Sequence, residues 1–102
     1  MYTELADEMK LLSDKTRLMI LAMLNEKELC VCDIVSVLDT TQPNVSQHLR
    51  KLKAGNLVSE KRKGQWIYYS INSDNKPYVR DILNSLPLIK HNDLEFQTLE
   101  RC

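Results

Sequence analysis

Hydrophobic residues recur at helical spacing through most of the first half of the chain. A first helix is predicted from three apolar residues that share one helical face, Leu5, Met9 and Leu12. Asp14 follows as a candidate N-cap for a second helix, because a short acceptor side chain there satisfies a backbone N–H. The dense apolar residues of 15–24 predict that this second helix is buried and about three turns long.

The same spacing predicts a third helix over 29–38 and, after a polar turn, a fourth helix over about 42–54. Thr41 can cap the fourth helix, and Pro43 in its first turn removes no hydrogen bond. The buried face of this helix would carry three apolar residues, Val45, Leu49 and Leu52. Gly55 is expected to end it, because glycine adopts the left-handed conformation without strain.

Two short strands are predicted after the fourth helix. Residues 57–62 and 65–71 flank Lys63-Gly64, and the glycine allows the positive φ that a tight hairpin turn needs. A helix, a tight turn and a helix with a polar outer face make a helix-turn-helix, and a basic hairpin after it makes a wing. We therefore predict a mainly α fold with a small β-hairpin (α+β), a winged helix-turn-helix, as a single domain over 1–102.

The last part of the chain predicts further helical structure. Residues 73–75 offer a cap for a C-terminal dimerisation helix over about 75–87, which Pro87 should end or kink. Residues 88–102 form a tail, with a short amphipathic piece at about 93–100. The terminal helices keep apolar faces that little remaining chain can cover, so we expect a homodimer through these helices.

Charge is balanced over the whole chain but uneven along it. The 102 residues include 14 basic and 14 acidic side chains, yet 1–14 are mainly acidic and 48–63 mainly basic. A local basic patch can hold phosphates, although a solvated charged face would have the same composition. No apolar run approaches the about 20 residues that cross a bilayer, and no signal peptide is recognisable. We expect a cytoplasmic protein with no membrane partner, whose cysteines are free or metal-bound.

The predicted recognition helix (about 42–54) and wing (about 57–71) carry side chains suited to double-stranded DNA. Amides and hydroxyls that suit base edges in the major groove are Gln42, Asn44, Ser46 and Gln47. Basic side chains that suit phosphates are Arg50, Lys51, Lys53, Lys61, Arg62 and Lys63. His48 could contact phosphate, be partly buried or bind metal. An ordinary amphipathic helix also has a polar face, but the order of caps, glycines and hairpin favours DNA binding.

A pair of cysteines, Cys30 and Cys32, lies at the start of the predicted third helix. Thiolates select soft ions. On an α-helix, residues two apart point about 200° from each other, whereas on an extended segment they point to the same side. We hypothesise that chelation by both thiols unwinds the first turn of this helix and weakens the grip on DNA, and that a nearby helix N-terminus favours thiolate. The alternative is a constitutive DNA-binding module with two buried structural cysteines.

The sequence offers residues for two other kinds of chemistry. His91 and Glu95 are four residues apart, a spacing that can bind zinc, with Asp93 or Asp81 to complete the site; a polar surface is the alternative. A small thiol oxidoreductase would be expected to carry Cys-x-x-Cys beside a βαβ unit, and the sequence predicts neither. We therefore predict that the chain is not an enzyme and has no catalytic residue and no permanent cofactor.

Four segments together resemble the ArsR/SmtB family of winged-helix metal-sensing transcriptional repressors. They are 12–18 (LSDKTRL), 28–33 (ELCVCD), 42–49 (QPNVSQHL) and 64–69 (GQWIYY). The sequence is most similar to the arsenic- and antimony-responsive branch of that family. The resemblance implies a homodimeric repressor that releases operator DNA when As(III) or Sb(III) binds cysteine thiolates in a three-sulfur pyramid.

The resemblance also bears on the ligand set. The arsenic branch usually has a third cysteine in a C-V-C-D-x-C pattern, and this chain has Val35 at that position. Cys102 is the only remaining thiol and is the candidate third ligand beside Cys30 and Cys32. Relatives that sense cadmium and lead share the C-V-C pair but add cysteines in an N-terminal extension, which this sequence does not show. A repressor of the same fold that senses Cd, Pb or thiol oxidation is the alternative.

Overall fold

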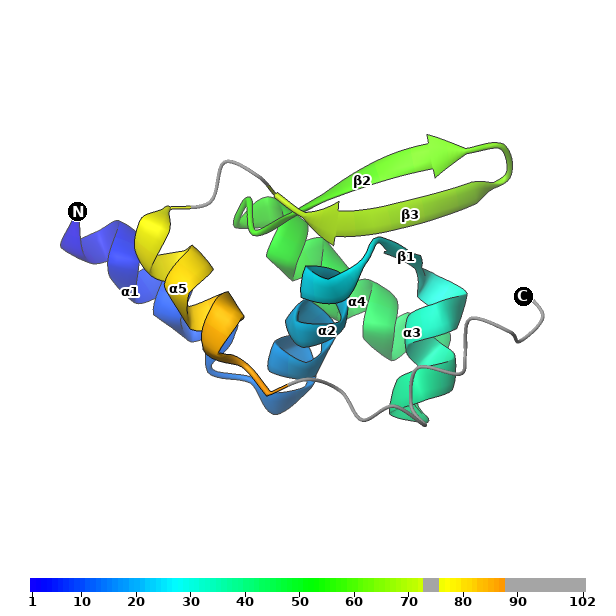
Figure 1. The fold of residues 1–102 in the computed structure, drawn as a ribbon, viewed down its shortest axis with the longest axis horizontal. Helices are drawn as coiled ribbons and strands as arrows, with labels where there is room; N and C mark the ends of the chain where they lie inside the picture. Colours follow the sequence, from blue (N-terminus) through cyan, green and yellow to red (C-terminus); the bar gives the residue numbers. More distant parts are fainter. Residues whose placement is uncertain (73–75, 88–102) are drawn as a thin grey trace.

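A computed structural model of the chain describes residues 1–72 and 76–87. Its elements are α1 (Tyr2–Leu12), α2 (Lys15–Glu26), β1 (Leu29–Cys30), α3 (Val31–Leu38), α4 (Gln42–Ala54), β2 (Val58–Lys63), β3 (Trp66–Ile71) and α5 (Pro77–Ser85). The helices gather around α2, and the β2–β3 hairpin extends beyond them (Figure 1). This is the predicted mainly α, winged helix-turn-helix fold. None of the helices in the described ranges is long and apolar enough to cross a membrane.

The central helix of the core is α2. Its N-cap is Asp14, as predicted, and the Asp14 carboxylate accepts a hydrogen bond from the backbone N–H of Arg17 at 3.0 Å. Five consecutive residues of α2 are buried, Ile20, Leu21, Ala22, Met23 and Leu24. A helix that is buried around its whole circumference needs neighbours on several sides. The neighbours of α2 are α1, α4, α5 and β3, so the predicted buried helix is confirmed.

The predicted helix-turn-helix consists of α3 and α4. Asp39 ends α3 in the left-handed conformation, with φ 53°. Thr41 then caps α4, because its hydroxyl accepts a hydrogen bond from the backbone N–H of Asn44 at 3.3 Å. The helix spans Gln42–Ala54, the predicted range, and Pro43 lies in its first turn. The predicted core residues of α4 are all fully buried, namely Val45, Leu49 and Leu52, so the polar side chains of α4 lie on its other face.

The wing belongs to an antiparallel sheet with the strand order β1–β3–β2. Lys63 pairs with Trp66, so the two turn residues are Gly64 and Gln65 rather than the predicted Lys63-Gly64. Gly64 has the positive φ, 65°, as expected for the first residue of a two-residue hairpin turn. The register differs from the prediction because the pairing of two strands depends on which face packs against the core.

The prediction was wrong at the start of α3. Leu29 and Cys30 form β1, opposite Tyr69 and Tyr68 of β3, and the helix begins only at Val31. Cys30 is the N-cap residue and has extended backbone, with φ −89° and ψ 167°. Backbone pairing with a strand far along the chain replaces helical hydrogen bonds here, and local periodicity cannot reveal such a pairing.

Gly55 ends α4, but not in the expected left-handed conformation. Its φ is −87°, and Asn56 is the residue with positive φ, 63°. A Cβ atom on Gly55 would collide with Cδ1 of Leu11. A larger residue at this position would therefore displace the flexible end of Leu11, which belongs to the last turn of α1.

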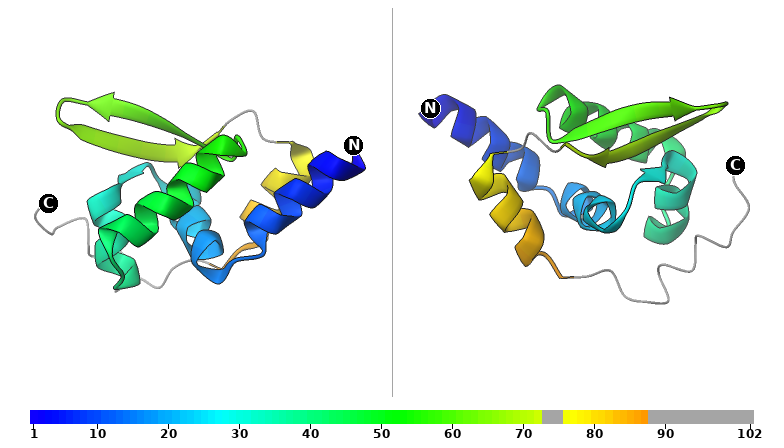
Figure 2. Two further views of the ribbon diagram at one scale, coloured as in Figure 1. Left: turned by 180° about the vertical axis from the view of Figure 1, so that it is seen from behind. Right: turned by 45° about the horizontal axis from the view of Figure 1, so that its top comes forward.

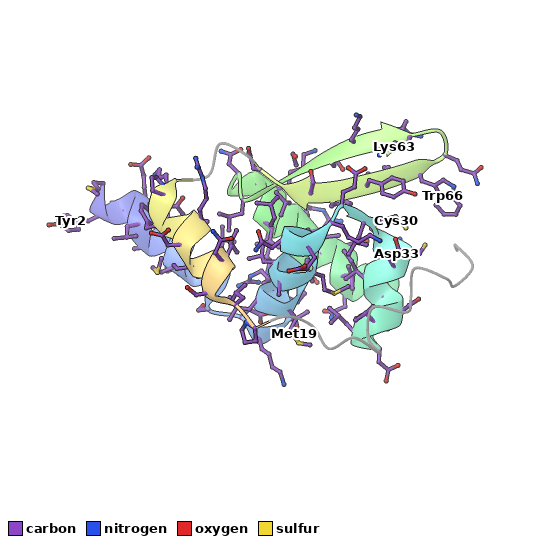
Figure 3. The ribbon with its side chains drawn as sticks, in the orientation of Figure 1. Tyr2, Met19, Cys30, Asp33, Lys63 and Trp66 are labelled. Carbon is purple, nitrogen blue, oxygen red and sulfur yellow. The ribbon has the colours of Figure 1, made fainter. Side chains whose placement is uncertain are left out.

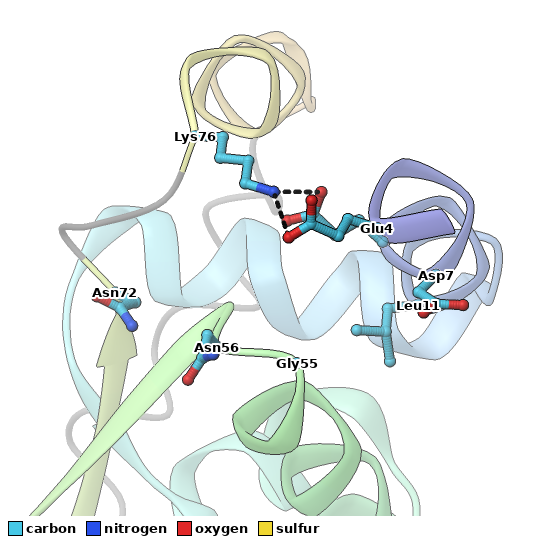
Figure 4. Close-up of a pocket in the computed structure, with 8 residues that line it drawn as sticks. Glu4, Asp7, Leu11, Gly55, Asn56, Asn72 and Lys76 are labelled. Atoms are coloured by element: carbon cyan, nitrogen blue, oxygen red, sulfur yellow. Dashed lines mark ion pairs between the residues drawn. The ribbon is translucent and has the colours of Figure 1, made fainter. Parts of the chain in front are cut away.

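The two terminal helices, α1 and α5, lie side by side at the end of the molecule opposite the hairpin tip (Figures 1 and 2). The hydroxyl of Tyr78 on α5 donates a hydrogen bond to Glu8 on α1, and this bond is the main cause that raises the pKa of Tyr78. Nζ of Lys76 lies 3.8 Å from carboxylate oxygens of both Glu4 and Glu8, bridging the two helices (Figure 4). Ionic and hydrogen-bonded contacts therefore join α1 to the start of α5.

The bounds of α5 fall inside the predicted range of 75–87. The N-cap of α5 is Lys76, without a side-chain cap hydrogen bond, and the helix ends at Ser85, before Pro87, as expected. The predicted cap at 73–75, the tail at 88–102 and its amphipathic piece at 93–100 lie outside the described residues.

Candidate functional site

The polar face of α4 carries the side chains predicted to meet DNA. Those that are exposed are Gln42, Gln47, Arg50, Lys51 and Lys53, and those that are partly exposed are Asn44, Ser46 and His48. Amide and hydroxyl groups occupy its first half, and two of the cations lie in its last turn, where the helix dipole favours positive charge. Asn44 is also held from within the turn, because its Nδ2 donates to the hydroxyl of Thr40 at 3.0 Å. The structure thus places these predicted residues on one helix.

The predicted wing residues Lys61, Arg62 and Lys63 are exposed along the outer part of the hairpin (Figure 3). Lys63 forms an ion pair with Glu28, which precedes β1, and its Nζ lies 5.0 Å from the centre of the Tyr68 ring. The wing is thereby attached to the segment that leads into the cysteine pair.

A second ion pair joins the end of α4 to β2. Lys53 pairs with Glu60, and the hydrogen bond from Lys53 lowers the pKa of that carboxyl. Burial, with Glu60 as the next cause, raises the pKa of the Tyr69 hydroxyl on the neighbouring strand. Two of the predicted phosphate-binding cations, Lys53 and Lys63, therefore each have an acidic neighbour. Glu28 comes from a segment far from Lys63 in the sequence, whereas Glu60 lies on the strand that follows α4, close to Lys53 in the chain.

His48 lies against the start of α2. Its side chain is 15% exposed, with Nδ1 3.2 Å from Nη1 of Arg17 and Nε2 3.9 Å from a carboxylate oxygen of Asp14. The hydrogen bond from the backbone N–H of Arg17 is the main cause that lowers the pKa of Asp14. Of the three roles that the sequence left open for His48, the structure shows partial burial.

The cysteine pair lies at the N-terminus of α3, where the sequence placed it, but the two residues have different surroundings. Cys30 is 2% exposed, and both its thiol and its backbone N–H donate to the same oxygen of Asp33, at 3.3 and 3.4 Å. Asp33 is buried as well, and these donors help to satisfy its carboxylate. Cys32 is half-buried in the first turn of α3. Cys30 and Asp33 lie close together beneath the hairpin (Figure 3).

The sequence-based predictions included Asp33, Arg17 and Glu28 neither among the DNA-binding residues nor at the cysteine pair. Asp33 is the third residue of α3, where an acidic side chain reaches back to the N-cap residue, so the spacing from Cys30 could have indicated it. Arg17 contacts His48 across a long stretch of chain, and no local pattern predicts that contact.

Within residues 1–72 and 76–87, no group of three or more His, Cys, Asp and Glu side chains is placed to hold a metal ion. Cys102, the candidate third ligand, lies outside these ranges, and so does the possible zinc group of His91, Asp93 and Glu95. Its fourth member, Asp81, is exposed on α5. Of the three predicted cysteine ligands, the described residues include Cys30 and Cys32.

Comparisons with known proteins agree with this architecture. Residues 14–60 match the family model described as "Bacterial regulatory protein, arsR family". The chain is 38% identical over 80 residues to the arsenic resistance transcriptional regulator ArsR2 of Pseudomonas putida, which covers 76% of this chain and 68% of that protein. It is 42% identical over 65 residues to the cadmium resistance transcriptional regulatory protein CadC of Listeria innocua, which covers 63% of this chain and 55% of that protein.

A solved structure shows the same arrangement of elements. It is the homodimeric winged helix-turn-helix DNA-binding domain (fragment 1–100) of Mb0332 from Mycobacterium bovis, a possible ArsR-family transcriptional regulator. The match has a TM-score of 0.71 at 29% identity and covers 81% of this chain and 74% of that one. Sequence and fold agree: the chain belongs to the arsR family of bacterial regulatory proteins, which are DNA-binding transcriptional regulators.

Proposed function

We propose that the chain is a homodimeric repressor that binds operator DNA and releases it when trivalent arsenic or antimony binds cysteine thiolates. The observation that carries this proposal is the position of Cys30 and Cys32 where β1 passes into α3, within the helix-turn-helix. Thiolates select soft, thiophilic ions. The similarity to a regulator named for arsenic resistance supports this class of inducer. Such a repressor would act in the cytoplasm, where its DNA lies.

DNA contact would come from α4 and the wing. The N-terminal half of α4 would enter the major groove, where its amides and hydroxyls reach base edges; these are Gln42, Asn44, Ser46 and Gln47. Phosphates would be neutralised by the predicted cations of α4 and the wing, Arg50, Lys51, Lys53, Lys61, Arg62 and Lys63. Among these, Lys53 and Lys63 would exchange their acidic partners for phosphate.

Dimerisation would use the terminal helices. Large apolar side chains remain exposed on α1, where Tyr2 is 87% and Met9 38% exposed. The homodimeric state of the Mb0332 domain supports the same assembly. In a two-fold dimer the recognition helices meet successive major grooves, about 34–36 Å apart along the DNA.

Release would begin at the junction of β1 and α3. Cys30 already has extended backbone and Cys32 lies inside the helix, so only the residues from Val31 onward would have to unwind in the first turn of α3. When Cys30 ligates a soft ion it gives up its thiol proton, and with it the hydrogen bond to Asp33. Asp33 also accepts from the backbone N–H of Cys30, so this change disturbs the start of the helix.

The disturbance would reach DNA through packing between helices. The recognition helix α4 contacts α3, so its support changes when the first turn of α3 changes. Coupling free energies of about 1–3 kcal/mol are typical of allosteric proteins and correspond to roughly 5–150-fold weaker operator binding. Cys102, from the same chain or from the dimer partner, is proposed as the third thiol.

A second candidate inducer is cadmium or lead, or oxidation of the thiols, acting on a repressor of the same fold. The similarity to a regulator named for cadmium resistance supports this second candidate. Cadmium and arsenic can both bind thiolates, so the described pair does not by itself choose between them.

The test is a titration of the reduced protein on its own promoter DNA, followed by fluorescence anisotropy. Arsenite, antimonite, cadmium and zinc are added in parallel to the wild type and to Cys30→Ser, Cys32→Ser and Cys102→Ser. We expect arsenite and antimonite to release the wild type and to have little effect on the first two variants. Release by cadmium alone would select the second candidate, and no DNA binding by the wild type would overturn both.

The same experiment tests whether Cys102 is the third ligand. Cys102→Ser should raise the arsenite concentration needed for release if the tail supplies a sulfur. Unchanged release by this variant would remove Cys102 from the site while leaving the roles of Cys30 and Cys32 in place.

A further inference from the structure

We propose that His48 serves DNA binding as a positioning residue, which fixes the recognition helix to the junction of α1 and α2 through Arg17 and Asp14. The proposal rests on the proposed function, because it assumes that α4 reads DNA. It replaces the expectation that His48 contacts DNA itself.

Both ring nitrogens of His48 face protein groups. Nδ1 lies 3.2 Å from Nη1 of Arg17, and a guanidinium has only donors, so Nδ1 accepts this hydrogen bond. The hydrogen-bond network then assigns the ring proton to Nε2, which lies 3.9 Å from a carboxylate oxygen of Asp14. With its side chain only 15% exposed, His48 would have to leave these neighbours before it could contact a phosphate.

Arg17 connects this ring to the end of α1. Its Nε donates to the carbonyl of Leu11 at 2.7 Å, and its Nη2 donates to the carbonyl of Lys10 at 3.2 Å. Carbonyls in the last turn of a helix lack partners within that helix, so Arg17 acts as a C-terminal cap of α1. The same guanidinium therefore binds α1 and α4, while its own backbone belongs to the first turn of α2.

Asp14 is the third member of the cluster formed with His48 and Arg17. Its carboxylate caps α2 by accepting from the backbone N–H of Arg17 at 3.0 Å, and it also lies beside the imidazole of His48. One carboxylate and one guanidinium thus hold the end of α1, the start of α2 and the middle of α4 in a single cluster.

Directional bonds matter here because direct contact between α1 and α4 is sparse. An open hollow of about 400 Å³ lies on the surface beside Arg17, and Lys10, Leu11 and Lys51 also line it. The two helices approach each other at Leu11 and Gly55, near the C-terminal end of α4. The cluster at His48 supplies a further point of attachment, nearer the middle of α4.

The orientation of α4 relative to α1 would set the DNA-binding geometry of a dimer. If α1 belongs to the dimer interface, the cluster fixes each recognition helix relative to the two-fold axis. The two helices must match major grooves about 34–36 Å apart, so a change in tilt weakens both half-site contacts at once.

The experiment compares His48→Leu, which removes the acceptor, with His48→Asn, whose amide oxygen can accept in place of Nδ1. Affinity for promoter DNA is measured over a range of salt concentrations. We expect His48→Leu to weaken binding by about 5- to 100-fold, because the Arg17 donor loses its partner. His48→Asn should stay within about threefold of the wild type.

The salt dependence separates positioning from phosphate contact. A residue that neutralises one phosphate contributes about 0.9 to the slope of log affinity against log salt. His48→Leu should keep the wild-type slope, whereas Arg50→Gln, an exposed site on the same helix, should reduce it. Urea unfolding of each variant confirms that the helices remain folded under the binding conditions.

Three results would overturn the proposal: wild-type affinity in His48→Leu, a slope reduced as in Arg50→Gln, or equal weakening by His48→Leu and His48→Asn. If His48→Leu does not fold, His48→Asn decides, since weak binding by this folded variant contradicts the role of the acceptor. Absence of DNA binding by the wild type is a different outcome, because it overturns the proposed function itself.

Discussion

The backbone of Cys30 lies opposite that of Tyr68 in the β1–β3 ladder, so the first cysteine of the pair belongs to the same sheet as the wing. Cys30 is also the N-cap of α3, which contacts the recognition helix α4. A change at this one residue therefore has two structural routes toward DNA, one through β3 and one through α3. The sequence-based hypothesis included only the second route.

Arsenite binding should loosen backbone pairing in the wing as well as the first turn of α3. We expect faster hydrogen–deuterium exchange in peptides that cover 66–71 and 31–35 when reduced protein is loaded with arsenite, because exchange reports local opening. Cys30→Ser is the control and should show no change. Faster exchange in α3 alone, with β3 unaltered, would contradict the route through the sheet.

Removing the acidic partner of the wing lysine should strengthen DNA binding. Glu28→Gln would free Lys63 to meet phosphate, and an exposed ion pair of this kind corresponds to about 2- to 5-fold in affinity. The gain should shrink at high salt, where surface charges are screened. Glu26→Gln, an exposed site at the end of α2, makes the same change in net charge. Equal gains from both variants would show that net charge, rather than the pairing with Lys63, is responsible.

Gly55→Ala should destabilise the fold by no more than about 1 kcal/mol, because the new methyl group would displace only the flexible end of Leu11. Urea unfolding measures the loss. In a Leu11→Ala background the same substitution should cost much less, since the colliding atom is gone. Gly64→Ala is the contrasting case: nothing lies within 4 Å of its Cβ position, and any cost comes from a positive φ of 65°. An equal cost of Gly55→Ala in both backgrounds would exclude the collision with Leu11.

Loss of the Thr41 cap should weaken the recognition helix. Thr41→Ala removes the acceptor for the backbone N–H of Asn44 and should lower the free energy of unfolding by about 1 kcal/mol. Thr41→Ser retains a hydroxyl and should be close to the wild type. If Ser and Ala are equally destabilising at this position, the methyl group of Thr41 matters more than its hydrogen bond.

Protonation of Asp14 should make the protein less stable in acid. Its pKa in the folded state lies below the ordinary value of 3.8, mainly because of the hydrogen bond from the backbone N–H of Arg17. Its charge therefore contributes stability above the unfolded pKa, and this contribution is lost as the pH falls through the folded pKa. Asp14→Asn keeps an N-cap acceptor but cannot titrate. Its urea midpoint should fall less than that of the wild type between about pH 5 and about pH 3, and parallel curves would contradict the assignment.

Local signals were sufficient for the helix-turn-helix. The range of α4 follows from a cap at Thr41, a proline in the first turn and three apolar residues at helical spacing, and all of these act within a few residues. The same holds for the N-cap at Asp14 and for the placement of the cysteine pair at a helix N-terminus.

Other features depend on segments that meet only after folding. Cys30 is in a strand because β3 lies beside it, and Gly55 lies against Leu11 of α1. The position of His48 on a polar helix face leaves phosphate contact, partial burial and metal binding open, and the structure places its ring against Arg17. Periodicity predicts which residues share a face, and it does not specify what that face contacts.

The amino-acid sequence by itself determined the order of the elements, the recognition helix and the presence of two cysteines at the start of α3, because capping and hydrophobic periodicity are properties of short segments. Tertiary structure decided that Cys30 is part of the wing sheet and that His48 on α4 contacts Arg17 and Asp14 at the junction of α1 and α2. Those relationships depend on strand register and side-chain packing between distant segments, which are settled only when the core assembles.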